Sequence, residues 1–162
     1  MQEPIIEVLE PARNPAALRL VTGLLAERGL GVDDDVEFFV VARRADDLIG
    51  CVGLAGNVVK CTAVTPTEAG AGIGARLMAE VQYQALERGR AHLFVYTQPS
   101  NRRTFTSLGY RPIAEVPGIV TLLENTPFGL SGYCERLRRE NNPVPGRIGA
   151  VVMHANPFTL GH

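Results

Sequence analysis

The short stretch GAGIG at residues 70–74 limits the possible folds more than any other part of the chain. It follows NVVKCTAV (residues 57–64), whose alternating residues predict a strand. It leads directly into residues 73–89, where Ile73 and Leu77 begin an apolar stripe at helical spacing. The first N–H groups of a helix lack internal partners, and the helix dipole makes that end positive. Glycines would let a phosphate reach this backbone, so the stretch predicts a phosphate-binding loop, or else only a tight turn.

Two other nucleotide-binding loops fit the sequence less well. A Walker A loop needs Lys and Ser or Thr after its last glycine, where this chain has Ala75 and Arg76. A dinucleotide fingerprint would place a third glycine at Ala75, although alanine is sometimes accepted there. That fingerprint also follows the first strand of its fold, whereas this loop follows several strands in an antiparallel-looking order.

The remaining patterns predict an α+β (α/β) fold with a mixed, mostly antiparallel central sheet flanked by helices. A first strand precedes a helix that Asn14 can cap and Pro15 can begin. Apolar runs separated by ADD predict a hairpin, and AHLFVYT predicts an interior strand. We expect one domain over residues 1–140, a linker at residues 141–146, and a new strand from residue 147. The positions expected on apolar helix faces include Leu20, Leu86, Leu130, Tyr133, Cys134 and Leu137.

Composition excludes several classes of function. Sixteen basic and seventeen acidic residues give a net charge of −1, which argues against nucleic acid or membrane partners. No apolar run approaches the ~20 residues that span a bilayer, and the start of the chain lacks a signal-peptide pattern, so we expect a cytoplasmic protein. Cys51, Cys61 and Cys134 form no CxxC pair and predict reduced thiols. The acidic triplet at residues 33–35 predicts a solvated loop, and no metal site is expected.

The order strand, AVTP, glycine loop, helix, strand and N…F…LGY, over roughly residues 5–125, resembles the GNAT acetyltransferase family. The resemblance implies the GNAT acyl-CoA N-acyltransferase fold and binding of acetyl-CoA or a CoA-like prosthetic group. The glycine-loop amides would hold the pyrophosphate, and the backbone of the preceding strand would pair with the pantetheine arm. The implied cofactor-binding residues are Ala63, Val64, Gly70, Ala71, Gly72, Ile73, Gly74, Ala75 and Asn101.

Two departures from the family pattern bear on activity. The loop often begins with Gln or Arg, where this chain has Ala69 preceded by Glu68, so we expect weakened pyrophosphate binding. The family often places a Tyr on the following short helix to protonate the leaving thiolate. That position holds Phe105, which has no acidic proton, and we expect it to pack in the core.

The final residues, GAVVMHANPFTLGH, resemble the first strand and signature loop of the HxGH nucleotidyltransferases, with Thr in the first place. A GNAT-like domain joined to such a motif is similar to the citrate lyase ligase family. The resemblance implies ATP, with Mg, and acetate as substrates and the acyl carrier subunit of citrate lyase, with its CoA-derived prosthetic group, as partner. Thr159 and His162 would be catalytic in adenylation, with an incomplete motif in this chain.

The sequence leaves two alternative functions open, a free-standing acetyl-CoA-dependent N-acetyltransferase and a non-catalytic docking module. Phe105 argues against the first, and the glycine loop argues against the second. His92 and His154 are interpreted as structural histidines. Arg102 and Arg103 either meet an adenosine phosphate or are simply solvated.

Overall fold

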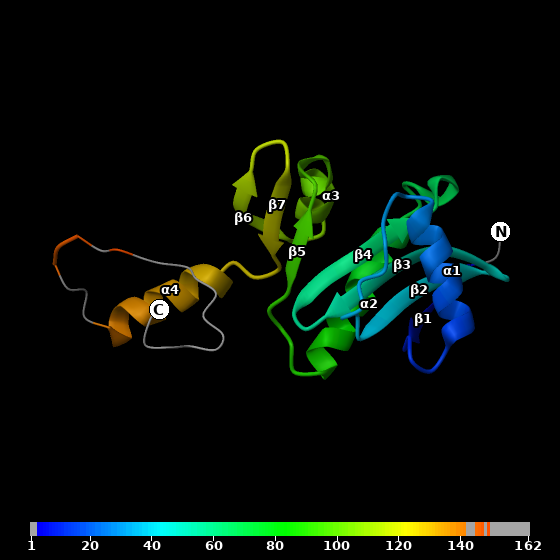
Figure 1. Cartoon of the computed structure of the whole chain (residues 1–162), viewed down its shortest axis with the longest axis horizontal. Coiled ribbons are helices and arrows are strands. Elements are labelled where there is room, and N and C mark those ends of the chain that lie inside the picture. The colour runs from blue at the N-terminus through cyan, green and yellow to red at the C-terminus, as the bar shows by residue number, and fades with distance from the viewer. Residues whose placement is uncertain (1–2, 142–144, 148, 150–162) are drawn as a thin grey trace, which may run out of the picture.

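The computed structural model describes residues 3–141, 145–147 and 149, and its core is one seven-stranded sheet (Figure 1). The strand order is β1-β2-β3-β4-β5-β7-β6. Within the described chain, β4 and β5 pair in parallel and the other neighbours pair antiparallel. The elements are β1 (Ile5–Leu9), α1 (Pro15–Ala26), β2 (Phe38–Arg44), β3 (Asp47–Ala55), β4 (Val58–Val64), η1 (Pro66–Glu68), α2 (Ile73–Glu87), β5 (Phe94–Thr97), η2 (Pro99–Asn101), α3 (Arg102–Ser107), β6 (Arg111–Val116), β7 (Val120–Glu124) and α4 (Gly129–Glu140).

The predicted mixed, mostly antiparallel sheet is therefore confirmed. The predicted start of the first helix is also found, because the Asn14 side chain accepts a hydrogen bond from the Ala17 amide at 3.0 Å and Pro15 opens α1. The predicted division at residues 141–146 and 147–162 lies mostly outside the described residues and stays a prediction.

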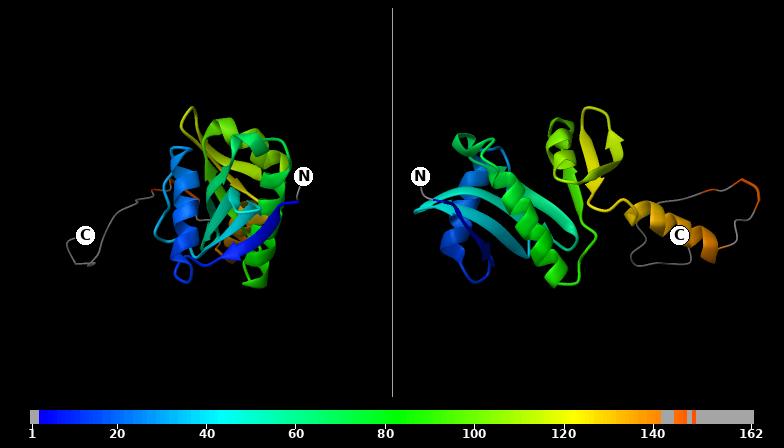
Figure 2. Two further views of the ribbon diagram at one scale, coloured as in Figure 1. Left: turned by 90° about the vertical axis from the view of Figure 1, so that its right-hand side faces the viewer. Right: turned by 180° about the vertical axis from the view of Figure 1, so that it is seen from behind.

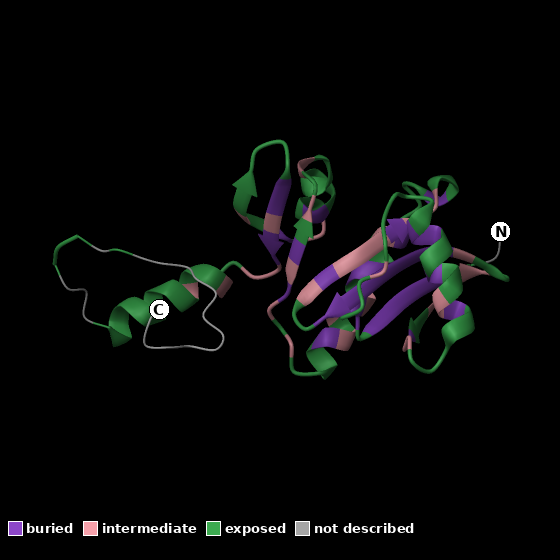
Figure 3. Cartoon of the chain, in the orientation of Figure 1, coloured by how far each residue is buried: buried purple, intermediate pink, exposed green. Residues whose placement is uncertain are grey.

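Helices cover both faces of the sheet (Figure 2). On one face, Val21 and Leu25 of α1 pack with Phe39 and Val41 of β2. On the other face, α2 and α3 pack over a larger cluster that includes Leu77 and the opposite-facing residues of the same strands. Because β2 and β3 are covered on both sides, their apolar runs are nearly continuous rather than alternating (Figure 3).

Two residues expected on apolar helix faces are exposed, and the predicted helix α4 is found with its apolar face uncovered by burial. Leu20 is exposed because the buried stripe of α1 runs through Ala17, Val21, Leu24 and Leu25, one position further round the helix. Leu86 is exposed because it lies beside Ala85, which continues the buried stripe of α2. The apolar face of α4 exists, but none of its residues is buried.

No helix in the described part of the chain is both long enough and apolar enough to cross a membrane.

Candidate functional site

The glycine loop folds as two tight turns that end at the first residue of α2. Gly70 and Gly72 have φ of +83° and +78°, a conformation that side chains with a Cβ rarely adopt. A Cβ placed on either glycine would meet no atom within 4 Å, so the space above the backbone is open. The first helical hydrogen bond runs from the Arg76 amide to the Gly72 carbonyl at 3.1 Å. The amides of Ile73, Gly74 and Ala75 therefore precede the helical ladder and are available to an anion.

Glu68, which precedes the loop, does not place an unbalanced charge beside it. The residue is only 8% exposed, and its carboxylate forms an ion pair with Arg44 at the end of β2. The pair ties η1 to the sheet and neutralises the carboxylate. The charge of Glu68 is therefore paired, and the expected weakening of pyrophosphate binding stays a prediction that now depends on Ala69 in place of Gln or Arg.

A gap opens between β4 and β5 next to this loop. The two strands pair only at Val58 with Phe94 and at Val59 with Val95. Beyond this point β4 carries a bulge, where two of its residues oppose one residue of β3, and Cys61 has a φ of +50°. A bulge bends its strand and increases the local twist, so it separates β4 from β5. No sequence pattern predicted this bulge.

The predicted cofactor residues lie toward the carboxyl ends of β4 and β5 or directly after them. Neighbouring parallel strands end on the same side, so the glycine loop after β4 and the segment from β5 to α3 lie at the same end of the sheet (Figure 1). Ala63 is buried in the pairing of β4 with β3. The carbonyl of Val64 already accepts a hydrogen bond from Arg28 at 2.5 Å, which sequence reasoning missed. Asn101 donates to the Thr97 hydroxyl at 3.1 Å and so is fixed against the end of β5.

Comparison with known proteins decides the family. The acetyltransferase (GNAT) domain family matches residues 26–128, which include the sheet from β2 to β7 and the glycine loop. The chain belongs to the GNAT acetyltransferase domain family. The GNAT domain of this chain is also similar to solved structures, among them an acyl-CoA N-acyltransferase from Pseudomonas aeruginosa, with a TM-score of 0.64, 14% identity, and coverage of 76% of this chain and 100% of the other. An aminoglycoside 6′-N-acetyltransferase complexed with coenzyme A also has a TM-score of 0.64 at 14% identity, covering 74% of this chain and 95% of the other.

Curated relatives of this GNAT chain are citrate (pro-3S)-lyase ligases. The Klebsiella pneumoniae protein is 41% identical over 159 residues, which are 98% of this chain and 46% of that protein. The Escherichia coli K12 protein is 39% identical over 142 residues, which are 88% of this chain and 40% of that protein. The chain thus spans less than half the length of these relatives.

Phe105 occupies the core of the GNAT domain, as predicted. It is 7% exposed, and its ring meets Tyr110 edge-on with centroids 6.1 Å apart. Burial raises the pKa of Tyr110 to about 12, and its hydroxyl lies 3.4 Å from the Gln82 amide nitrogen. Neither ring is thus suited to give a proton to a leaving thiolate.

Other candidate residues of the GNAT domain have structural partners. His92 lies 2.7 Å from the buried Glu124 carboxylate, which supports its interpretation as a structural histidine. Arg102 pairs with Glu115 at 2.9 Å, whereas Arg103 lines a shallow hollow of about 470 Å³ on α3. In the acidic triplet, Asp33 and Asp35 pair with Lys60. Among the described residues, no group of three or more His, Cys, Asp or Glu side chains is placed to hold a metal ion.

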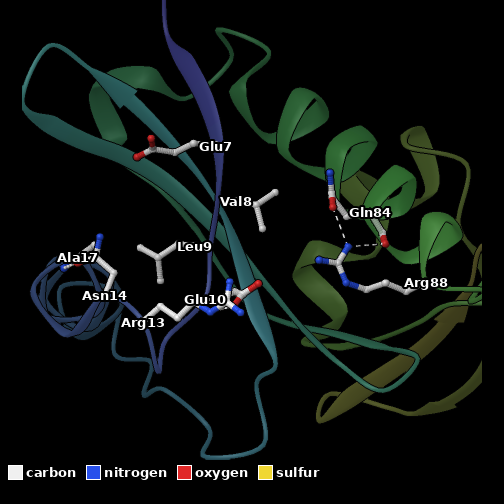
Figure 4. A pocket seen from close by; sticks show the side chains of 9 residues that line it. All are labelled: Glu7, Val8, Leu9, Glu10, Arg13, Asn14, Ala17, Gln84 and Arg88. Atoms are coloured by element: carbon white, nitrogen blue, oxygen red, sulfur yellow. Dashed lines mark hydrogen bonds and ion pairs between the residues drawn. The ribbon is translucent and has the colours of Figure 1, made fainter.

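A hollow in the described structure is separate from this site. It has a volume of about 640 Å³ and lies along the edge strand β1 (Figure 4), three places along the sheet from β4. Its charged side chains already have partners, since Arg13 pairs with Glu10 and Arg88 bonds to Gln84. The glycine loop therefore remains the candidate functional site. The predicted adenylation residues Thr159 and His162, with His154, lie outside the described residues.

Proposed function

We propose that this GNAT domain binds a CoA-like arm and presents its thiol to an acyl-adenylate, as part of a citrate lyase ligase. The observation that carries the proposal is the open backbone cradle at Gly70–Ala75 beside the gap between β4 and β5. The identity of 38–41% to citrate lyase ligases supports the choice of the arm on the citrate lyase acyl carrier subunit as the physiological ligand.

The residues present fit such an arm. Pyrophosphate oxygens can reach the amides of Ile73 to Ala75, because the two preceding positive-φ glycines have no side chains. The arm itself carries amide groups, and the part of β4 beyond Val59 has no β5 partner for its backbone in the described structure. Asn101, held by Thr97, lies at the end of β5 as a further polar contact.

The core position of Phe105 favours a reaction in which the thiol is acylated over a reaction in which the thiolate is the leaving group. In acetyl transfer to an amine, the CoA thiolate departs and needs a proton from an acid. In the proposed ligase reaction the thiol sulfur attacks the acyl carbon, the bond from that carbon to the phosphate oxygen breaks, and AMP departs while the thiol proton passes to water. This second reaction does not require a general acid on α3. ATP with Mg and acetate would be used at the predicted Thr159 and His162 motif to form the adenylate.

Calorimetric titration of the chain with CoA tests the proposal. We expect a single-site exothermic isotherm, together with acetyl transfer from acetyl-CoA to polyamines or lysine peptides well below about 1 per second. Absence of binding at millimolar CoA would contradict the proposed function. Binding accompanied by rapid amine acetylation would instead favour a free-standing acetyltransferase.

A substitution at Phe105 separates these two functions further. Phe105→Tyr should leave amine acetylation unchanged, because the added hydroxyl enters the core beside Tyr110 rather than the gap. The buried hydroxyl should lower the free energy of unfolding by about 1–3 kcal/mol. Steady-state acetylation assays and urea denaturation measure the two effects. A marked gain in acetylation would show that α3 does face a reacting thiol.

A further inference from the structure

Thr121, near the start of β7, is fully buried, and its hydroxyl has no hydrogen-bond partner within the described part of the chain. Burial of an unpaired hydroxyl destabilises a folded protein, and valine would occupy nearly the same space without a polar atom. Buried polar groups in native structures nearly always have a partner. The neighbours of Thr121 therefore show which groups its hydroxyl can reach.

Thr121 is the middle member of a polar row across three strands. It lies directly opposite Thr97 of β5 on one side and Glu115 of β6 on the other. Residues opposite each other in an antiparallel sheet share a face and have Cβ atoms about 5 Å apart. At the start of α3, Asn101 donates to the Thr97 hydroxyl at 3.1 Å, and Arg102 donates to the Glu115 carboxylate at 2.9 Å. Both ends of the row are therefore bonded to the start of α3, and its middle is the unpaired hydroxyl.

We propose that Thr121 closes a hydrogen-bond chain that runs from Asn101 to Glu115 and fixes the Asn101 amide for the CoA-like arm. The Thr97 hydroxyl accepts from Asn101, so its own proton is available to the next hydroxyl in the row. Thr121 accepts that proton and donates its own to Glu115, whose carboxylate has lone pairs beyond the one that Arg102 uses. At this Cβ spacing, each link is either direct or passes through one ordered water.

The direction of this chain decides which atom Asn101 offers to a ligand. Its Nδ2 is used on Thr97, and its Oδ1 accepts no hydrogen bond from the described residues. Thr97 is the last residue of β5, so Asn101 lies at the same end of the sheet as the glycine loop. The choice of ligand rests on the proposed function, in which Oδ1 accepts from an amide N–H or the S–H of the arm. Thr121 is then a positioning residue, because it is fully buried and acts through Asn101.

The urea midpoint of unfolding tests the hydrogen-bond chain without any ligand. Thr121→Val removes the hydroxyl and nearly keeps the shape of the side chain. If the hydroxyl has no partner, the midpoint should rise, because an unpaired buried polar group is removed. If the hydroxyl belongs to the chain, the midpoint should fall, and this is the result that we expect. A higher midpoint for Thr121→Val would overturn the proposal, whether or not the protein binds CoA.

Calorimetric titration with CoA tests the effect on Asn101. Thr121→Val should weaken CoA binding about fivefold, whereas Thr121→Ser keeps the hydroxyl and should bind within about twofold of the unchanged chain. Because Thr121 acts through Asn101, adding Thr121→Val to Asn101→Ala should change the affinity by less than about twofold.

Three results of the titration would each overturn the proposal. They are unchanged affinity in Thr121→Val, equal losses in Thr121→Val and Thr121→Ser, and a full further loss on top of Asn101→Ala. If the unchanged chain does not bind CoA, the proposed function fails, and the urea midpoint of Thr121→Val alone decides whether the hydrogen-bond chain exists.

Discussion

Gly72→Val should reduce the affinity for CoA by at least about 100-fold, the equivalent of two lost charge-assisted hydrogen bonds to phosphate. Gly72 has a φ of +78° and immediately precedes the amides that we assign to the pyrophosphate. A valine there is strained in this conformation, and relief of the strain would turn the amides out of the cradle. Any valine that keeps the conformation would fill the open space above the loop. Calorimetry with CoA measures the loss.

The matched control is Gly118→Val in the hairpin between β6 and β7. Gly118 has a φ of +73° and open space around it, so it should suffer a similar backbone strain. It is far along the chain from the glycine loop and belongs to the hairpin at the edge of the sheet. Gly118→Val should lower stability while CoA affinity stays as in the unchanged chain. If Gly72→Val bound CoA equally well while folded, the loop would be only a turn.

Arg44→Met should lower the free energy of unfolding by about 3 kcal/mol, because it leaves the Glu68 carboxylate buried without its cation. Since Glu68 belongs to η1, which leads into the glycine loop, CoA affinity should fall as well. Denaturant unfolding and calorimetry follow the two effects. Arg44→Met combined with Glu68→Leu should recover most of the stability, because the buried charge is then absent.

Arg43→Met provides the comparison within the same strand. Arg43 also makes an ion pair, with Glu7 at 2.8 Å, but the Glu7 side chain is about half exposed. Exposed pairs contribute roughly 0–1 kcal/mol, so Arg43→Met should change stability little. Equal losses from the two arginine variants would show that burial of Glu68 is not what makes the Arg44 pair important.

The parts of the fold that depend on local sequence were predictable. Asn14 and Pro15 mark the start of α1, and the apolar runs of β2 and β3 indicate a hairpin, because these signals act within a few residues. Leu20 was expected on the apolar face of α1 and Leu86 beside that of α2, and both are exposed, since helical periodicity defines a face only to within one residue position. Which neighbour covers that face depends on the tertiary structure.

In the candidate site, too, the features that depend on local sequence were predictable and those that depend on tertiary structure were not. The glycine loop was visible because it lies at a strand-to-helix junction, and Phe105 was placed in the core from its motif position. The pairing of Arg44 with Glu68 joins residues 24 positions apart, and no sequence pattern indicated it. The bulge at Cys61 was also missed, because it depends on how β3 and β4 align rather than on a glycine or proline in the strand.

The narrow contact between β4 and β5 makes the sheet mechanically uneven. Four strands on one side and three on the other meet along a seam of only two residue pairs, so the two halves can tilt against each other at little cost in hydrogen bonding. A molecule bound in the gap would act as an additional strand across the seam. Such a ligand would make the sheet stiffer. It would couple the two halves of the sheet, slow amide exchange along β4, and make the domain unfold as one unit.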